Sequence, residues 1–284
     1  DAVGSQFTPA WFFASLAAAG VQVHGFHSLW EGLRRFRFLW TLNRRNHRKL
    51  LVIDEDVGYF GGMNVSATGD PPTPKGSAPS SGGGSWRDVH VRLAGPDQVA
   101  IADSYARSWR RAHGEKIRRR RRSYRRGILS LRHDAILFFD SGPGARFTRV
   151  ARVFARVLRQ ANSSIDISMA YFVPVGRVLR AILRARRQGA AIRVVIPSHS
   201  DVPMVEWAAR HLYRGLLRRG FTLYERQLRM LHSKLIVVDR EWTVVGSANL
   251  DARSLYFNFE FIAVIRSQEL AQLMVGIIDE EIAQ

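Results

Sequence analysis

The chain has 284 residues, 46% of them hydrophobic, which is enough to bury the core of one large domain or of two packed halves. It has no cysteine, so disulfides, thiolate metal sites and thiol redox chemistry are excluded. A formal net charge of +19 predicts an anionic partner, such as nucleic acid, an acidic lipid surface or a phosphorylated small molecule.

The first part of the chain predicts helices and strands separated by a polar insertion. In chain order, the patterns indicate a helix within residues 9–20 that ends at Gly20, strands at 21–26, 47–54 and 86–93, and a helix around 97–113. Residues 69–85 are rich in Gly, Ser and Pro, which is typical of a flexible surface insertion. Residues 29–40 interleave aromatic and basic side chains. They fit either an ordinary helix with Phe36, Phe38 and Trp40 in the core or an amphipathic helix in a lipid interface.

The second part alternates strands and helices, as in an α/β protein with a largely buried sheet. The predicted strands and helices lie at residues 164–170, 176–189, 191–197, 203–220, 221–226, 232–239, 258–265 and 268–283. Between the two parts, residues 116–126 (KIRRRRRSYRR) form a basic run. This run is either a solvated linker or a contact with an anionic surface. We therefore expect a first half at 1–115, a basic linker at 116–130 and a second half at 131–284.

A sequence pattern occurs twice in this chain, once in each half. HRKLLVID followed by GGMN, in residues 47–64, matches HSKLIVVD followed by GSAN, in residues 232–249. Four residues recur at a constant separation of 185 positions: His47 and His232, Lys49 and Lys234, Asp54 and Asp239, and Asn64 and Asn249. After the insertion the separation falls to 172, as for Asp88 and Glu260. The repeat predicts two halves of similar fold.

The register before the first motif predicts that the first half lacks its opening elements. Gly20 and Gly220, which end corresponding helices, are separated by 200 positions, so Asp1 corresponds to Asp201. Residues 164–200 then have no counterpart. We expect a complete sheet in the second half and a shorter one in the first, with an exposed edge beside residues 21–26.

The repeated residues are suited to binding and reacting with a tetrahedral phosphate. Side chains two apart on a strand point to the same face, so each His lies beside its Lys. Each Asn follows a turn in which Gly61, Gly62, Gly246 and Ser247 let the backbone approach closely. Lys is a poor metal ligand and neither copy supplies a second His or carboxylate at ligand spacing, so the pattern predicts no metal site.

The acidic residues near the motifs divide into two kinds. Asp54 and Asp239 end their strands at turns, which favours a structural role. Asp88 and Glu260 are candidates for the carboxylates that hold the second nitrogen of each imidazole, although each could instead form a surface ion pair.

These residues resemble the phospholipase D superfamily, whose signature is H-x-K, four residues, D, and then G-G/S-x-N. Residues 45–54, 86–96, 170–174, 200–220 and 246–260 look in particular like bacterial cardiolipin synthases. The resemblance implies an α/β fold of two pseudo-twofold-related halves, each a mixed sheet flanked by helices, with the first half truncated at its start. It also implies one cleft containing His47, Lys49, Asn64, His232, Lys234 and Asn249, a phosphohistidine intermediate, and no metal or other cofactor. By this resemblance His47 is the nucleophile and His232 the general acid.

Three functions are compatible with the sequence. The first is phosphatidyl transfer between two phosphatidylglycerol molecules by a protein bound peripherally to the cytoplasmic side of the cell membrane, with anionic phospholipid as its partner. The second keeps the two-histidine chemistry but makes the protein a phospholipase or nuclease. The third is a basic nucleic-acid-binding module, against which the two matched histidines argue, because binding a phosphate backbone requires only Lys and Arg.

Overall fold

The computed structural model describes residues 5, 8–26, 44–54, 56–65, 86–114, 132–142, 149–200, 202–227 and 230–283. The elements of the first half are α1 (Ala10–Ala18), β1 (Leu50–Ile53), β2 (Val57–Gly61), β3 (His90–Ala94), η2 (Pro96–Gln98) and α4 (Val99–Ala112). Those of the second half are β4 (Ala135–Asp140), α5 (Arg149–Leu158), β5 (Ser164–Met169), α6 (Gly176–Arg187), β6 (Ala191–Pro197), α7 (Pro203–Leu217), β7 (Thr222–Arg226), β8 (Lys234–Val238), β9 (Trp242–Gly246), α8 (Ala252–Tyr256), β10 (Phe261–Arg266) and α9 (Gln268–Ile282).

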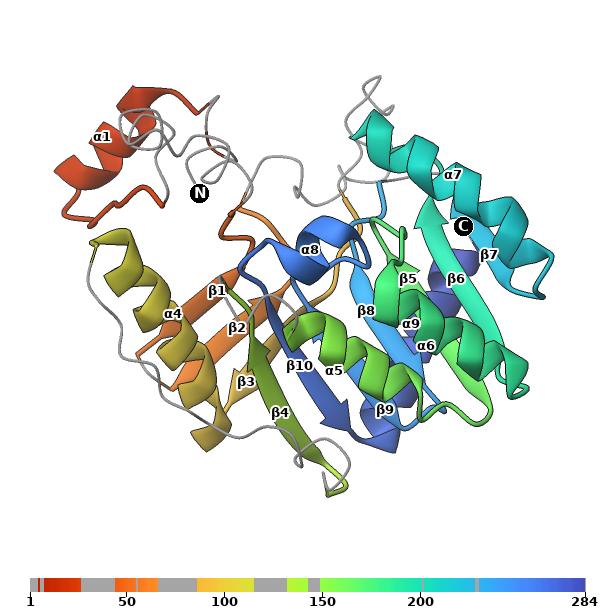
Figure 1. Ribbon diagram of the computed structural model, residues 1–284. Helices are drawn as coiled ribbons and strands as arrows, with labels where there is room; N and C mark the ends of the chain where they lie inside the picture. Colours follow the sequence, from red (N-terminus) through yellow and green to blue (C-terminus); the bar gives the residue numbers. More distant parts are fainter. Residues whose placement is uncertain are drawn as a thin grey trace, which may run out of the picture.

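The strands form two sheets of unequal size (Figure 1). One sheet has three antiparallel strands in the order β1-β2-β3. The other has seven strands in the order β4-β10-β9-β8-β5-β6-β7, and only its β5-β6-β7 segment is parallel. The predicted mixed α/β architecture is therefore confirmed, with sheets that differ in size as the repeat register required.

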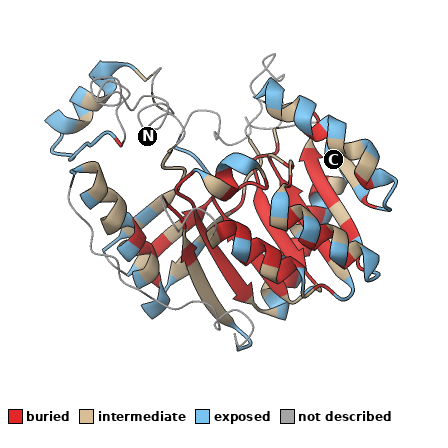
Figure 2. Cartoon of the chain, in the orientation of Figure 1, coloured by how far each residue is buried: buried red, intermediate tan, exposed pale blue. Residues whose placement is uncertain are grey.

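Helices cover both faces of the large sheet and one face of the small sheet. In Figure 1, α5 and α6 lie in front of the large sheet, α9 lies behind it, and α4 lies against β1 and β2. Buried residues are much more numerous on the strands of the large sheet than on those of the small sheet (Figure 2). One core cluster, which includes Phe154, Ile182 and Ile236, lies on the α5 and α6 side. A second cluster joins Phe60 and Ile101 of the first half to residues of β8, β9, β10 and α9, so the two halves share a core.

Strands β1 to β3 repeat the hydrogen-bond register of β8 to β10. Leu50 pairs with Phe60 as Leu235 pairs with Val245, at the separation of 185 found in the sequence. Gly61 pairs with His90 as Gly246 pairs with Ile262. This pairing is kept although Gly61 and Gly246 are 185 positions apart and His90 and Ile262 are 172 positions apart. The internal repeat is therefore a repeat of sheet structure.

The small sheet has an uncovered face and differs from one expectation. Ile236 and Val238 are buried against α5 and α6, whereas their counterparts Leu51 and Ile53 are 52% and 44% exposed. Residues 21–26 contain no strand, so the prediction of a strand there was wrong. Residues 21–26 correspond to β7, which pairs with β6 in the second half. The described part of the first half has no strand equivalent to β6 to which the backbone groups of residues 21–26 could pair. Within the described residues, the edge strands of the small sheet are β1 and β3.

Four elements of the second half had not been predicted, namely β4, α5, β9 and α8. β4 pairs antiparallel with β10 at the edge of the large sheet, and α5 packs on α6 and α8. β4 and α5 precede residue 164, where the predicted pattern began. Residues 29–40, the 69–85 insertion and the 116–130 linker lie outside the described residues, so the proposed domain boundaries stay a prediction. No helix in the described ranges is long and apolar enough to cross a bilayer.

We predict that Gly246→Ala destabilises the fold, because the new Cβ would collide with the backbone oxygen of Phe261 and with Ile262. We expect a loss of roughly 2–3 kcal/mol in the free energy of unfolding, measured by urea denaturation. Gly276→Ala in α9 is the matched control, since nothing lies within 4 Å of its added Cβ and Ala is the better helix former. An equal effect at the two positions would contradict the prediction.

Candidate active site

Each motif histidine is fixed by backbone contacts with the opposite half. His47 N–H donates to Phe259 O at 3.0 Å, and His232 N–H donates to Arg87 O at 2.7 Å. The flanking parallel bridges join Asn46 to Phe259 and Arg87 to Leu231. Asn46 corresponds to Leu231 by the separation of 185, and Arg87 corresponds to Phe259 by the separation of 172. The two bridges are therefore equivalent contacts with the halves exchanged. A pseudo-twofold relation between the halves would produce this arrangement.

The carboxylates that hold the imidazoles cross between the halves in the same way. Asp88 Oδ2 of the first half lies 2.6 Å from His232 Nδ1 of the second. Glu260 of the second half lies 3.1 Å from His47 Nδ1 of the first, through both of its oxygens. A carboxylate only accepts, so each Nδ1 carries a proton and each Nε2 of a neutral ring is left with a lone pair. The expected carboxylate–imidazole contacts are thus present, but each one crosses between the halves.

The two carboxylates are supported differently. Glu260 is completely buried and accepts from Ser247 Oγ at 2.5 Å and Asn258 Nδ2 at 3.1 Å. Burial acts to raise the pKa of Glu260, but His47, Lys49 and the Ser247 hydrogen bond outweigh it and lower that pKa. The residue that corresponds to Ser247 is Gly62, where a side chain would collide with Asp88. The second half therefore has the longer Glu260 beside Ser247 where the first half has the shorter Asp88 beside Gly62.

The two lysines contribute positive charge to one shared site. Lys49 and Lys234 each donate to the backbone oxygen of the histidine two residues before them, His47 and His232. Burial lowers the pKa of Lys49 to about 8 in spite of Glu260 and Asp88. Among the causes that lower the pKa of His47 is the charge of Lys234, and Lys49 acts likewise on His232. Charged groups of the two motifs are therefore close enough to influence one another.

Both imidazoles are neutral at pH 7, for the same main reason. Burial lowers the pKa of His232 to about 4, assisted by the charge of Lys234 and opposed by Asp88. Burial also lowers the pKa of His47, against the opposing effect of Glu260. The side chain of His47 is 27% exposed and that of His232 is 6% exposed, with the Trp86 ring tilted against it at a centroid distance of 4.9 Å. His47 is thus the more accessible of the two.

The two asparagines differ in their surroundings. Asn249 is buried, and its side-chain oxygen has no hydrogen-bond partner in the described part of the chain. Asn64 is exposed at the end of the described segment 56–65. The structure therefore brings Asn249, with unused hydrogen-bonding capacity, to the buried motif, while Asn64 stays a prediction.

Asp54 and Asp239 occupy the turns expected for them. Both have positive φ, at 51° and 53°, in equivalent turns of the two hairpins. Asp239 accepts hydrogen bonds from the backbone N–H groups of Asn162, Ser163 and Ser164. Those hydrogen bonds lower the pKa of Asp239 although burial opposes them. This contact joins the β8–β9 turn to the start of β5, which is a structural role.

Arg48, which the sequence did not single out, supports the residues behind His47. It pairs with Asp140, and its guanidinium lies 5.1 Å from the centre of the Phe259 ring. Arg48 also donates to Ser141 O, and Ser141 Oγ accepts from the backbone N–H of Glu260 at 2.7 Å. Arg48 thus connects the first motif to the segment that positions Glu260. No spacing in the sequence reveals this link, because its partners are about 90 and 210 residues away.

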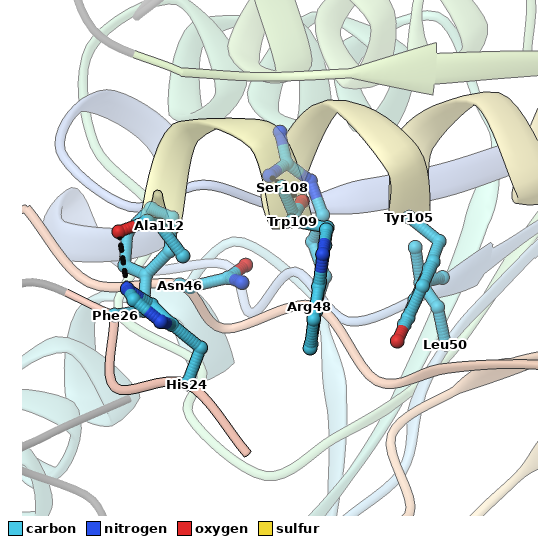
Figure 3. Close-up of a pocket in the computed structure, with 9 residues that line it drawn as sticks. All are labelled: His24, Phe26, Asn46, Arg48, Leu50, Tyr105, Ser108, Trp109 and Ala112. Carbon is cyan, nitrogen blue, oxygen red and sulfur yellow. Dashed lines mark hydrogen bonds between the residues drawn. The ribbon is translucent and has the colours of Figure 1, made fainter. Parts of the chain in front are cut away.

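A cavity of about 210 Å³ lies between α4 and the segments that carry His24 and Arg48 (Figure 3). Arg48 stands in its middle and Trp109 lies on the α4 wall. By the register offsets, Arg48 corresponds to Ser233 and Trp109 to Glu281. In the second half that pair closes the space, since Ser233 Oγ donates to Glu281 Oε1 at 3.2 Å. The halves therefore differ behind their two histidines.

The described residues contain no group of three or more His, Cys, Asp or Glu side chains able to hold a metal ion. The donors that converge on the site are instead ammonium, imidazole and amide groups. Such donors are suited to a phosphate oxyanion.

Comparison with known proteins agrees with the geometry. A family model described as "Cardiolipin synthase, PLD-like domain" matches residues 154–281. "Cardiolipin synthase A" of Pseudomonas aeruginosa is 33% identical over 291 residues, which cover 100% of this chain and 55% of that protein. "Cardiolipin synthase 1" of Staphylococcus epidermidis is 30% identical over 285 residues, which cover 100% of this chain and 56% of that protein. The chain is thus similar to bacterial cardiolipin synthases along its full length, and to their phospholipase D-like domain over residues 154–281.

The chain spans about half the length of the curated relatives it matches. Among solved structures, the phospholipase D family member Nuc from Salmonella typhimurium is 20% identical and covers 52% of this chain and 93% of its own. Its TM-score of 0.44 is too low to carry an argument.

We predict that nitrogen NMR of the histidine side chains at pH 7 finds both His47 and His232 neutral and protonated at Nδ1. Glu260→Gln should change the tautomer balance of His47, because the acceptor-only carboxylate is replaced by an amide that can also donate. His232, held by Asp88, should keep its signal. A change at His232 alone would show that the crossed pairing is wrong.

We predict that stability falls as the pH is lowered from about 6.5 towards 4. The folded pKa of His232 is about 4 against an ordinary value of 6.5, so in this window the unfolded chain binds a proton that the folded one does not. The loss attributable to His232 is at most about 1.4 kcal/mol per pH unit. Thermal melts of wild type and His232→Asn at pH 7, 6 and 5 measure it, and we expect a shallower slope in the variant. Parallel slopes would contradict the assignment.

Proposed function

We propose that this chain is a cardiolipin synthase-like phosphatidyltransferase that uses phosphatidylglycerol. The observation that carries the proposal is the pair of neutral imidazoles, each held at Nδ1 by a carboxylate of the opposite half. The similarity to curated cardiolipin synthases supports the choice of substrate.

In the proposed mechanism, His47 Nε2 attacks the phosphorus of one phosphatidylglycerol. The P–O bond to the glycerol headgroup breaks, His232 donates a proton to the departing oxygen, and a phosphohistidine forms on His47. A hydroxyl of a second phosphatidylglycerol then gives its proton to His232 and attacks the phosphohistidine, which yields cardiolipin and restores His47. Glycerol is the other product, so atoms and protons balance.

The division of roles follows from the surroundings of the two rings. His47 is the more exposed, and its lowered pKa leaves Nε2 unprotonated and able to attack. His232 must carry a second proton, which its pKa of about 4 disfavours in the free protein. A bound phosphodiester brings a negative charge that raises this pKa, and so couples protonation of His232 to substrate binding.

Lys49, Lys234, Asn64 and Asn249 hold the phosphate oxygens in this proposal. The charges of Lys49 and Lys234 offset the charge that develops on the pentacoordinate phosphorus, and the buried Asn249 supplies a hydrogen bond. Asp88 and Glu260 keep the rings oriented, and Asp54 and Asp239 fix the turns. No step requires a metal ion or another cofactor.

We further propose that the protein acts at the cell membrane, bound peripherally on the cytoplasmic side. The +19 charge supports an anionic lipid partner. If water reached the phosphohistidine first, the same residues would perform phospholipase D-type hydrolysis, and the products distinguish the two outcomes.

We predict that the protein converts radiolabelled phosphatidylglycerol in mixed vesicles into cardiolipin and glycerol, in the presence of a chelator. His47→Ala and His232→Ala should each reduce turnover by at least about a thousandfold, since attack and proton transfer have no substitute. After an alkaline quench, phosphorus label should be found on His47, because the P–N bond of a phosphohistidine is stable in alkali and labile in acid. Phosphatidic acid as the main product would indicate hydrolysis, and label on His232 would reverse the roles.

His211→Ala is the control for the two histidine variants, because this exposed imidazole on α7 has no part in the proposed chemistry. It should retain wild-type turnover on a water-soluble phosphodiester. Wild-type turnover in His47→Ala or His232→Ala would overturn the two-histidine mechanism.

A further inference from the structure

Helix α7 leaves large apolar side chains in solvent at its N-terminal end. Met204 and Trp207, three residues apart on one side of the helix, are 80% and 74% exposed. The helix is held to the protein mainly further along, where Ala209 and Leu216 are buried. In Figure 2 the outer surface of α7 is correspondingly exposed along its length.

The apolar end of α7 is connected to the candidate active site by a short path. A narrow crevice between the helix and the strand ends is lined by Tyr171, Phe172, Val205 and Tyr213, among others. Residue Ala170, at its other wall, donates from its backbone N–H to Ser233 O at 2.9 Å. Phe172 forms a bridge with Leu250. The crevice wall therefore touches the residues next to His232 and Asn249.

The remainder of the exposed α7 surface is basic. Arg210, Arg214, Arg218 and Arg219 are exposed in the second half of the helix and the turn after it, against the single acidic residue Glu206. Glu206 pairs with Arg210 at 3.0 Å, which leaves an excess of positive charge. Apolar and aromatic side chains at one end, with arginines beside them, are the composition of a surface that binds at a lipid interface.

The first half presents a helix on the same side. Figure 1 shows α1 and α7 at opposite ends of the same rim of the molecule. Helix α1 has no buried residues, and its Trp11 and Phe12 are 69% and 42% exposed. By the separation of 200 between Gly20 and Gly220, α1 corresponds to the second half of α7. A flat surface could therefore contact both helices.

We propose that the exposed face of α7 docks on an anionic lipid bilayer, with Trp207 and Met204 inserted at the interface and the arginines on lipid phosphates. This deepens the proposed function and rests on it, because the docked face would direct a phospholipid headgroup towards His232. A nucleic acid would use the arginines but gains nothing from an exposed Met204, so the apolar end favours lipid.

The test compares a Met204→Ser/Trp207→Ser double variant with Leu273→Ser, in which an apolar side chain on α9 that is 61% exposed is replaced. Partition onto sedimented vesicles of phosphatidylglycerol and phosphatidylcholine is measured at low salt. We expect the double variant to bind about tenfold less tightly, while Leu273→Ser binds as wild type. A third variant, Arg214→Gln/Arg218→Gln, should lose affinity mainly for vesicles rich in phosphatidylglycerol.

Two further measurements separate this inference from the proposed function. Cleavage of a water-soluble phosphodiester should be unchanged in the double variant, while its apparent KM for vesicular phosphatidylglycerol rises about tenfold. If wild type binds vesicles through α7 but converts no lipid, the proposed function fails and the docking face stands. Equal vesicle binding by the double variant and Leu273→Ser, with matched thermal melts, rejects the docking face. Loss of affinity only for single-stranded DNA would also reject it and assign the surface to nucleic acid.

Discussion

The crossed pairing of carboxylates and imidazoles is the contact on which the rest of this molecule depends. Glu260 reaches His47 and Asp88 reaches His232, so neither half completes a histidine environment alone. The Glu260 and Asp88 side chains are buried, and an unpaired buried carboxylate would be costly, so the halves must pack in one register. The reciprocal bridges of Asn46 with Phe259 and of Arg87 with Leu231 fix that register in the backbone.

The shared core follows from the same requirement. Phe60 of β2 packs edge-on against Phe261 of β10, and Ile101 of α4 belongs to the same cluster. Apolar burial therefore holds together the two halves that supply the site. A change in this cluster would move the carboxylates relative to the imidazoles as well as reduce stability, which links packing directly to chemistry.

The repeat has kept its backbone register but has diverged in its side chains. Ser247 and Glu260 stand where the first half has Gly62 and Asp88, and Arg48 stands where the second half has Ser233. These differences surround the two histidines unequally: His47 is partly open, and His232 is enclosed under Trp86. Two chemically identical groups thus acquire different accessibility, which supports the different roles proposed for them.

The sequence by itself determined the α/β class, most strands and helices of the second half, and the hairpin register of the repeat. The local hydrophobic periodicity predicted the strands and helices. The constant separation of the repeated motif residues predicted the hairpin register, because equivalent residues pair in the same way in both halves. Only the tertiary structure decided which carboxylate meets which imidazole, how Arg48 supports Glu260, and that residues 21–26 form no strand. Each of these depends on partners distant in the chain or on a missing ladder neighbour. Contacts of this kind produce no periodic pattern in the sequence, because they form only when the two halves pack together.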